Sequence, residues 1–191
     1  MLGKAIFGIV FFVCSWFSNA NEPGLNERFK LVEVASGSFV QHKHFKVLNH
    51  PIESRGEFYF DHKLGMIWKT TFPVTSTMLM KKGGLFITDR FNNTKKLPAA
   101  MPVAKIREQV LSGNIAAIKK EFNVKGSFDN VCMILEPKGS VLSQVFNKIE
   151  LCGQQALERL VLHENAGNRT EISVLLQEVE KLPEVVSAQL Q

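Results

Sequence analysis

Residues able to perform catalysis or to bind a metal are sparse in this sequence. Gly37-Ser38-Phe39 places a serine after a glycine, but the second glycine of a nucleophile elbow is missing. His42 and His44 are two residues apart on an expected strand, so both point to the same side, and His50 follows nearby. That stretch supplies no carboxylate or cysteine to complete a site, so we interpret these residues as strand histidines and predict no metal.

Other catalytic patterns are also missing from the sequence. We find no pair of carboxylates placed for acid–base chemistry and no glycine-rich phosphate loop. We therefore predict a protein that is not an enzyme, with no catalytic residue and no cofactor. A hydrolase or other lipid-modifying enzyme, with residues brought together only by folding, stays open as an alternative.

The first twenty residues are typical of a signal peptide. Lys4 precedes the apolar run Ala5 to Val13, and Ser18-Asn19-Ala20 has the small residues of a cleavage site. We predict cleavage after Ala20, which leaves residues 21–191 as a single exported domain. Its modest basic excess is scattered in pairs such as Lys81-Lys82, so we expect no nucleic-acid partner.

Cys132 and Cys152 are the two cysteines that remain after this cleavage. An oxidising compartment favours a disulfide between them. The segment that separates them reads as strand, Pro-Lys-Gly-Ser turn and strand, so the two residues could meet across a hairpin on its outer face. Two isolated buried thiols are the alternative.

The elements that must position these residues follow from hydrophobic periodicity and turn signals. Three helices are expected, at 23–35, 102–112 and 114–122, and residues 178–191 should form a short extension. The order of helix, strands, helix pair and strands indicates one α+β domain with antiparallel strands. The expected strands are 38–45, 54–60, 66–70, 76–80, 85–88, 128–136, 145–151, 156–163 and 169–176.

The stretch "GEFYFDHKLGMIWKT", residues 56–70, predicts the clearest hairpin. A five-residue connection places Phe58 opposite Trp68 and Phe60 opposite Met66 on one apolar face. We expect the sheet to curve around that face, and the interior is either a filled core or a hollow. The expected inner face comprises Phe58, Phe60, Met66, Trp68, Leu79, Leu85, Ile87, Val131, Met133, Leu135, Ile149 and Leu151.

Both helices of the pair are short and each carries a narrow apolar stripe. Such helices need an apolar surface to pack against. The stripe residues are Val103, Ile106 and Val110 in the first helix and Ile115, Ile118 and Phe122 in the second.

The run "SGSFVQHKHF", followed by "PIESRGEFYFDHKLGMIWKTTFPVTSTMLMKKGGLFI", resembles the LolA-like carriers of outer-membrane lipoproteins. The later segments "CMILEPKGSVLSQVFNKIEL" and "LERLVLHENAGNRTEISV" are similar to the end of that family, so the likeness covers about residues 25–176. The matching motif positions are Gly37, Phe39, Gln41, Gly56, Phe58, Trp68, Pro73 and Gly83.

This resemblance implies an incomplete antiparallel β-barrel whose apolar cavity takes up acyl chains of a lipoprotein or a related lipid under a helical lid. It also implies a monomer in the periplasm that receives cargo from an inner-membrane ABC transporter and delivers it to an outer-membrane acceptor. The lid would contain the helix pair together with the N-terminal helix. Relatives latch the lid with an arginine, whereas this chain has His62 followed by Lys63, so we expect a weaker or pH-sensitive latch. A docking protein with a filled barrel is the remaining alternative.

Overall fold

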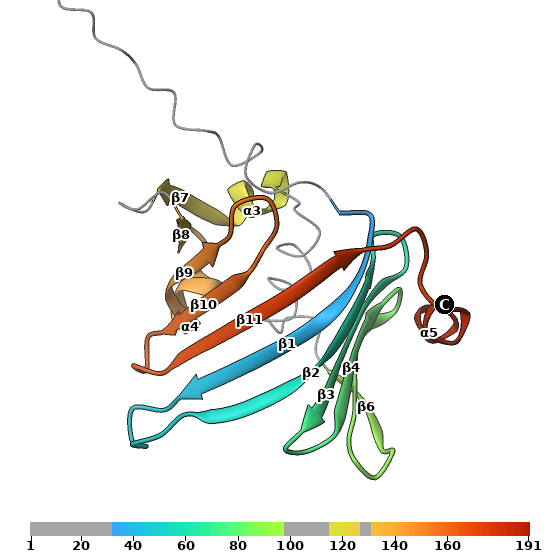
Figure 1. The fold of residues 1–191 in the computed structure, drawn as a ribbon. Coiled ribbons are helices and arrows are strands. Elements are labelled where there is room, and N and C mark those ends of the chain that lie inside the picture. Colours follow the sequence, from blue (N-terminus) through green and yellow to red (C-terminus); the bar gives the residue numbers. More distant parts are fainter. Residues whose placement is uncertain (1–31, 98–114, 127–130) are drawn as a thin grey trace, which may run out of the picture.

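One curved antiparallel sheet dominates the computed structural model, which describes residues 32–97, 115–126 and 131–191 (Figure 1). Within these ranges eleven strands lie in the order β6-β5-β4-β3-β2-β1-β11-β10-β9-β8-β7. The sheet stays open because β6 and β7 are its two edges. The predicted class, an α+β incomplete antiparallel barrel, is confirmed.

Two meanders make up this sheet, and they meet where β1 pairs with β11 as well as with β2. The first strands are β1 (Val34–His44), β2 (Ile52–Asp61), β3 (Gly65–Phe72), β4 (Ser76–Lys81), β5 (Gly84–Thr88) and β6 (Thr94–Leu97). The second part contains α3 (Ile115–Glu121), β7 (Phe122–Gly126), β8 (Cys132–Pro137), α4 (Ser140–Val145), β9 (Phe146–Cys152), β10 (Arg159–Glu164), β11 (Arg169–Glu178) and α5 (Glu184–Leu190).

The hairpin of β2 and β3 has the predicted register. Phe58 pairs with Trp68 and Phe60 with Met66, so all four side chains share a face. The turn is held by Asp61, whose carboxylate accepts hydrogen bonds from the backbone N–H groups of Lys63 and Leu64 at 2.8 and 3.0 Å. An aspartate that caps its own turn in this way fixes the register of the strands around it.

Each face of the sheet has its own apolar cluster. The larger cluster lies on the concave face, which we call the inner face, and includes residues from β1, β2, β3, β8, β9, β10 and β11. The smaller cluster lies on the outer face, where Ile67 of β3 is buried with Leu182 and Leu190. The helix α5, which contacts β3 and β4, therefore covers part of the outer face (Figure 1).

Two glycines make room for aromatic rings on the inner face. Gly37 pairs with Phe58 and Phe39 pairs with Gly56, so each phenylalanine lies opposite a glycine on the neighbouring strand. A Cβ on Gly37 would lie 2.7 Å from the Phe58 ring, and one on Gly56 would lie 2.8 Å from the Phe39 ring. Because real Cβ atoms do not approach so closely, only glycine permits these rings to lie flat across the adjacent strand.

The structure differs from the sequence prediction at several element boundaries. The predicted first helix cannot extend to Ala35, because β1 begins at Val34, and residues 23–31 lie outside the described residues. The region predicted as a turn at 137–140 leads into α4, and the expected C-terminal extension contains α5. A signal for α5 was present in the sequence, since Leu182, Val186 and Leu190 recur every four residues.

Candidate lipid-binding face

The inner face is built from alternating positions of consecutive strands. In β2 the side chains of Phe58 and Phe60 are fully buried there, and Met66 and Trp68 of β3 lie opposite them. In β4 the neighbouring positions are Met78 and Met80, which pair with Trp68 and Met66 and pack against the same cluster. The result is a continuous apolar surface that crosses the first meander.

Trp68 is the centre of an aromatic stack on this surface. Its ring centroid lies 3.9 Å from that of Phe39 and 5.8 Å from that of Phe58, with interplanar angles of 24° and 19°. Stacked rings of this kind add to the stability that their buried area supplies. Phe39 was not among the predicted inner-face residues, although its phase in β1 follows from the alternation of Ala35, Gly37 and Phe39.

Ten of the twelve predicted residues lie on the inner face. Leu85 and Ile87 of β5 share it because they pair with Met80 and Met78. The binding role of all ten stays a prediction. They are Phe58, Phe60, Met66, Trp68, Leu85, Ile87, Met133, Leu135, Ile149 and Leu151.

Two predicted inner-face residues lie elsewhere. Leu79 pairs with Ile67 and packs in the outer cluster with α5, so its prediction was wrong. Met78, Leu79 and Met80 are all apolar, and alternation alone does not reveal which face such a run presents. Val131 is 42% exposed and precedes the first residue of β8, so it is not part of the buried inner face.

Only part of the expected lid falls within the described residues. Val103, Ile106 and Val110 lie outside them. Ile115 begins α3, and Ile118 of the same helix is buried in the inner cluster. Phe122 is buried there too, but it is the first residue of β7 and not helical as expected, because residues 122–126 pair with β8.

The predicted latch residues are exposed in the turn between β2 and β3. The backbone N–H of His62 donates to the Glu33 carbonyl at 2.8 Å. This hydrogen bond does not involve the exposed imidazole ring of His62. Lys63 is likewise exposed at the same end of the sheet. A contact from either side chain to the lid remains a prediction, because residues 98–114 lie outside the described ranges.

Charged side chains occupy the outer face of the second meander. Glu150 lies 2.8 Å from both Lys148 Nζ and His163 Nε2. Burial lowers the pKa of His163, and the charge of Lys148 lowers it further against the opposing effect of Glu150. Burial would raise the pKa of Glu150, but its hydrogen bonds and charge interactions with Lys148 and His163 hold that pKa below the usual value. The second meander is thus apolar on its inner face and ionic on its outer face.

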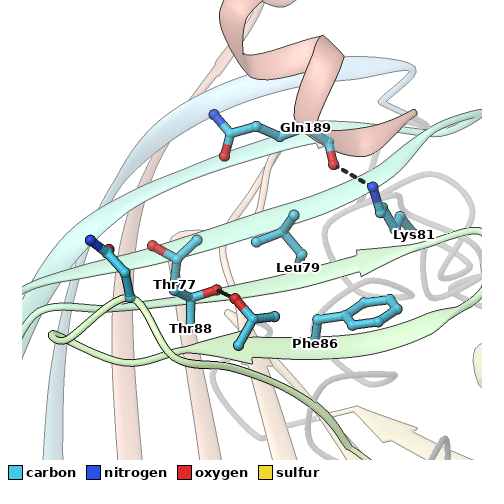
Figure 2. A pocket seen from close by; sticks show the side chains of 8 residues that line it. Thr77, Leu79, Lys81, Phe86, Thr88 and Gln189 are labelled. Carbon is cyan, nitrogen blue, oxygen red and sulfur yellow. Dashed lines mark hydrogen bonds between the residues drawn. The ribbon is translucent and has the colours of Figure 1, made fainter.

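A groove of about 410 Å³ lies on the outer face beside α5 (Figure 2). It has a mixed lining, since Leu79 and Phe86 alternate with threonines and Lys81 donates a 2.8 Å hydrogen bond to the Gln189 carbonyl. Because of these polar residues, the groove provides less apolar contact surface for an acyl chain than the inner face does.

Cys132 and Cys152 form the predicted disulfide. They are a directly opposed pair of β8 and β9, with Cα atoms 4.0 Å apart, on the outer face. Glu150 lies close to both sulfur atoms, but a disulfide has no thiolate to offer a metal. The guanidinium of Arg159 lies 3.6 Å from the Cys152 sulfur and covers the bridge from β10.

Removal of this bridge should destabilise the protein. The bonded residues are 20 apart in sequence, and closing a loop of that length in the unfolded chain corresponds to about 3 kcal/mol. We expect the double variant Cys132→Ala/Cys152→Ala to lose about that much free energy of unfolding in urea titrations. Reducing agent should destabilise the parent protein similarly and leave the double variant unchanged. An equal response of both proteins to the reductant would contradict the bridge.

Comparison with known proteins agrees with this architecture. The family model described as outer membrane lipoprotein carrier protein LolA matches residues 30–185. The chain therefore belongs to the LolA family. No curated protein in the comparison matches the sequence.

The solved structures to which this chain is similar are distant in sequence. A LolA superfamily protein from Nitrosomonas europaea is 13% identical, with a TM-score of 0.50 over 86% of this chain and 94% of that chain. A DUF1329 family protein from Desulfovibrio piger is 10% identical, with a TM-score of 0.49 over 84% and 92% of the two chains. At such identities the first likeness establishes the fold alone.

Helices long and apolar enough to traverse a bilayer do not occur in the part of the chain that the structure describes.

Proposed function

We propose that this protein is a periplasmic carrier that shields the acyl chains of a lipoprotein, or of a related lipid, against the inner face of its sheet. The observation that supports this most is the apolar surface centred on Trp68, which spans both meanders of an open sheet. Membership of the LolA family agrees with it. Residues 1–20 would direct export, and residues 21–191 would form the carrier domain.

Transport requires that binding be strong enough to carry the cargo and weak enough to release it. Burial of an acyl chain yields about 0.8 kcal/mol per methylene, or roughly 12 kcal/mol for sixteen carbons before any cost. A helical lid that must open, and thereby expose apolar surface, would offset much of that gain. We propose that residues 102–121 supply this lid, and that His62 and Lys63 hold it.

The cargo would pass from an inner-membrane exporter to an outer-membrane acceptor. The carrier would act between these two membrane partners because a free acyl chain would otherwise aggregate in water. The alternative function, a lipid-modifying hydrolase, predicts that the protein hydrolyses an acyl ester. Substitution of its nucleophile would abolish this activity.

Trp68 provides a direct test, because it is the single tryptophan of residues 21–191. We expect cis-parinaric acid to receive energy from Trp68 in a saturable manner, and palmitate to compete, because the fatty acid would lie against the aromatic stack. The measurement is sensitised emission during titration of the mature chain. Native mass spectrometry of protein from its own periplasm would identify the co-purifying lipid.

Absence of saturable transfer would contradict carriage and favour a barrel filled by its own side chains. Competition by palmitate is the control for nonspecific adsorption, since adsorbed probe is not displaced at low competitor concentration.

A further inference from the structure

One end of the sheet carries most of the exposed apolar side chains. In an antiparallel meander, alternate connections fall at the same end. The β1–β2, β3–β4, β5–β6 and β10–β11 turns and the helix α4 therefore lie together along the lower edge in Figure 1. We call this edge the turn rim and define it as residues 45–52, 72–75, 89–93, 140–145 and 165–168.

Hydrogen bonds join three neighbouring connections of the turn rim. The backbone N–H of Lys46 donates to Asn168 Oδ1 at 3.2 Å, which joins the β1–β2 and β10–β11 turns. The side-chain amide of Asn165 donates to the Ser143 carbonyl, and its backbone N–H donates to the Val145 carbonyl at 2.9 Å, which joins that turn to α4.

Eight of the eleven exposed large hydrophobic residues in the described ranges lie on this rim. Val47 is 87% exposed and Phe91 is 68% exposed, each at the tip of its turn. The other six are Leu48, Ile52, Phe72, Val74, Val141 and Val145. At the opposite end of the sheet Val131 is the sole such residue that the described ranges contain. The exposure is thus concentrated at one end.

Basic side chains accompany the aromatic rings of the turn rim. Three cations lie over rim phenylalanines: Lys43 over Phe45 at 5.1 Å, Arg55 over Phe72 at 4.8 Å and Arg90 over Phe91 at 4.6 Å. A cation beside a projecting apolar ring suits the boundary of a bilayer, where the ring reaches the acyl region and the cation meets a phosphate.

The acidic groups nearby are largely engaged within the protein. Glu53 pairs with Arg55 at 2.9 Å, and Glu164 pairs with Lys43 at 3.3 Å. Asp89 accepts hydrogen bonds from backbone N–H groups of its own turn. Lys46 and Arg90 have no ion pair with a described residue, so both remain available to an anionic partner.

We propose that the turn rim docks on a bilayer that contains anionic phospholipid. The apolar tips would enter the interface, and Lys46 and Arg90 would meet lipid phosphates. This inference goes beyond the carriage of cargo and does not require it, because the rim residues are separate from the inner face around Trp68.

Vesicle flotation of the mature chain tests the proposal. We expect binding to protein-free vesicles of phosphatidylethanolamine with phosphatidylglycerol, and much weaker binding to phosphatidylcholine vesicles. Val47→Ser/Phe91→Ser should reduce the binding constant by about tenfold or more, because two apolar tips no longer enter the lipid. Lys46→Gln/Arg90→Gln should remove most of the preference for anionic lipid.

Leu175→Ser/Val185→Ser is the matched control, since these residues are 66% and 78% exposed but lie outside the rim. It should bind vesicles as the parent does. Equal losses in the rim and control variants, or binding only to membranes that retain their proteins, would overturn the proposal. Energy transfer from Trp68, measured on the same variants, separates this result from cargo uptake, which the rim changes should leave intact.

Discussion

Met80→Glu is expected to weaken binding of a fatty acid by roughly 30- to 150-fold, whereas Leu79→Glu should leave binding nearly unchanged. Both residues are half-buried in β4, but Met80 packs on the inner face and Leu79 on the outer face. A carboxylate on the inner face would lose water to an apolar ligand, at a cost of about 2–3 kcal/mol in binding. The measurement is a titration with cis-parinaric acid, in which energy transfer from Trp68 reports binding.

This pair of variants separates function from folding. Each introduces a charge next to apolar neighbours, so we expect each to lower the free energy of unfolding by about 1–3 kcal/mol. Urea titration supplies that comparison. If both variants lost the same fraction of fatty-acid binding, the inner face would not be the site of uptake.

Gly37→Ala and Gly56→Ala should each destabilise the fold by about 2–3 kcal/mol. The added Cβ of Gly37→Ala meets the Leu175 carbonyl oxygen and the Phe58 ring, and that of Gly56→Ala meets the Lys69 carbonyl oxygen and the Phe39 ring. These close contacts can be removed only if the strands separate or the aromatic rings turn away. Since both rings stack on Trp68, the emission of this residue should shift in either variant.

Gly139→Ala is the control for these two substitutions. This glycine has a φ of −90°, and a Cβ there meets nothing within 4 Å. We expect a change in free energy of unfolding of no more than about 1 kcal/mol, measured by urea titration. The double variant Gly37→Ala/Gly56→Ala should lose less free energy of unfolding than the two single variants lose together, because both changes disturb the same aromatic stack. Strict additivity would show that the two rings act independently.

The sequence by itself determined the strands and much of their inner face. Where apolar and polar residues alternate, as in 56–61, the period of two assigns each side chain to one side of the sheet. The short connection after Asp61 then placed Phe58 against Trp68, which the register confirms. The sequence also favoured a disulfide between Cys132 and Cys152, and the structure places them directly opposite each other on β8 and β9.

Tertiary structure decided the features that local patterns leave ambiguous. Leu79 lies in an apolar run, and its face became clear only because α5 covers the outer side of β3 and β4. Phe122 fits a helical stripe and a strand equally well, and the backbone groups of β8 selected the strand.

The remaining features depend on contacts between distant parts of the chain. No local signal predicts that β1 pairs with β11, or that Gly37 and Gly56 must accept the rings of Phe58 and Phe39. The turn rim likewise forms only when four hairpin turns and α4 converge at one end of the sheet. The physical reason is that side-chain periodicity is local, whereas strand order, close approach and shared surfaces arise from pairing across the whole fold.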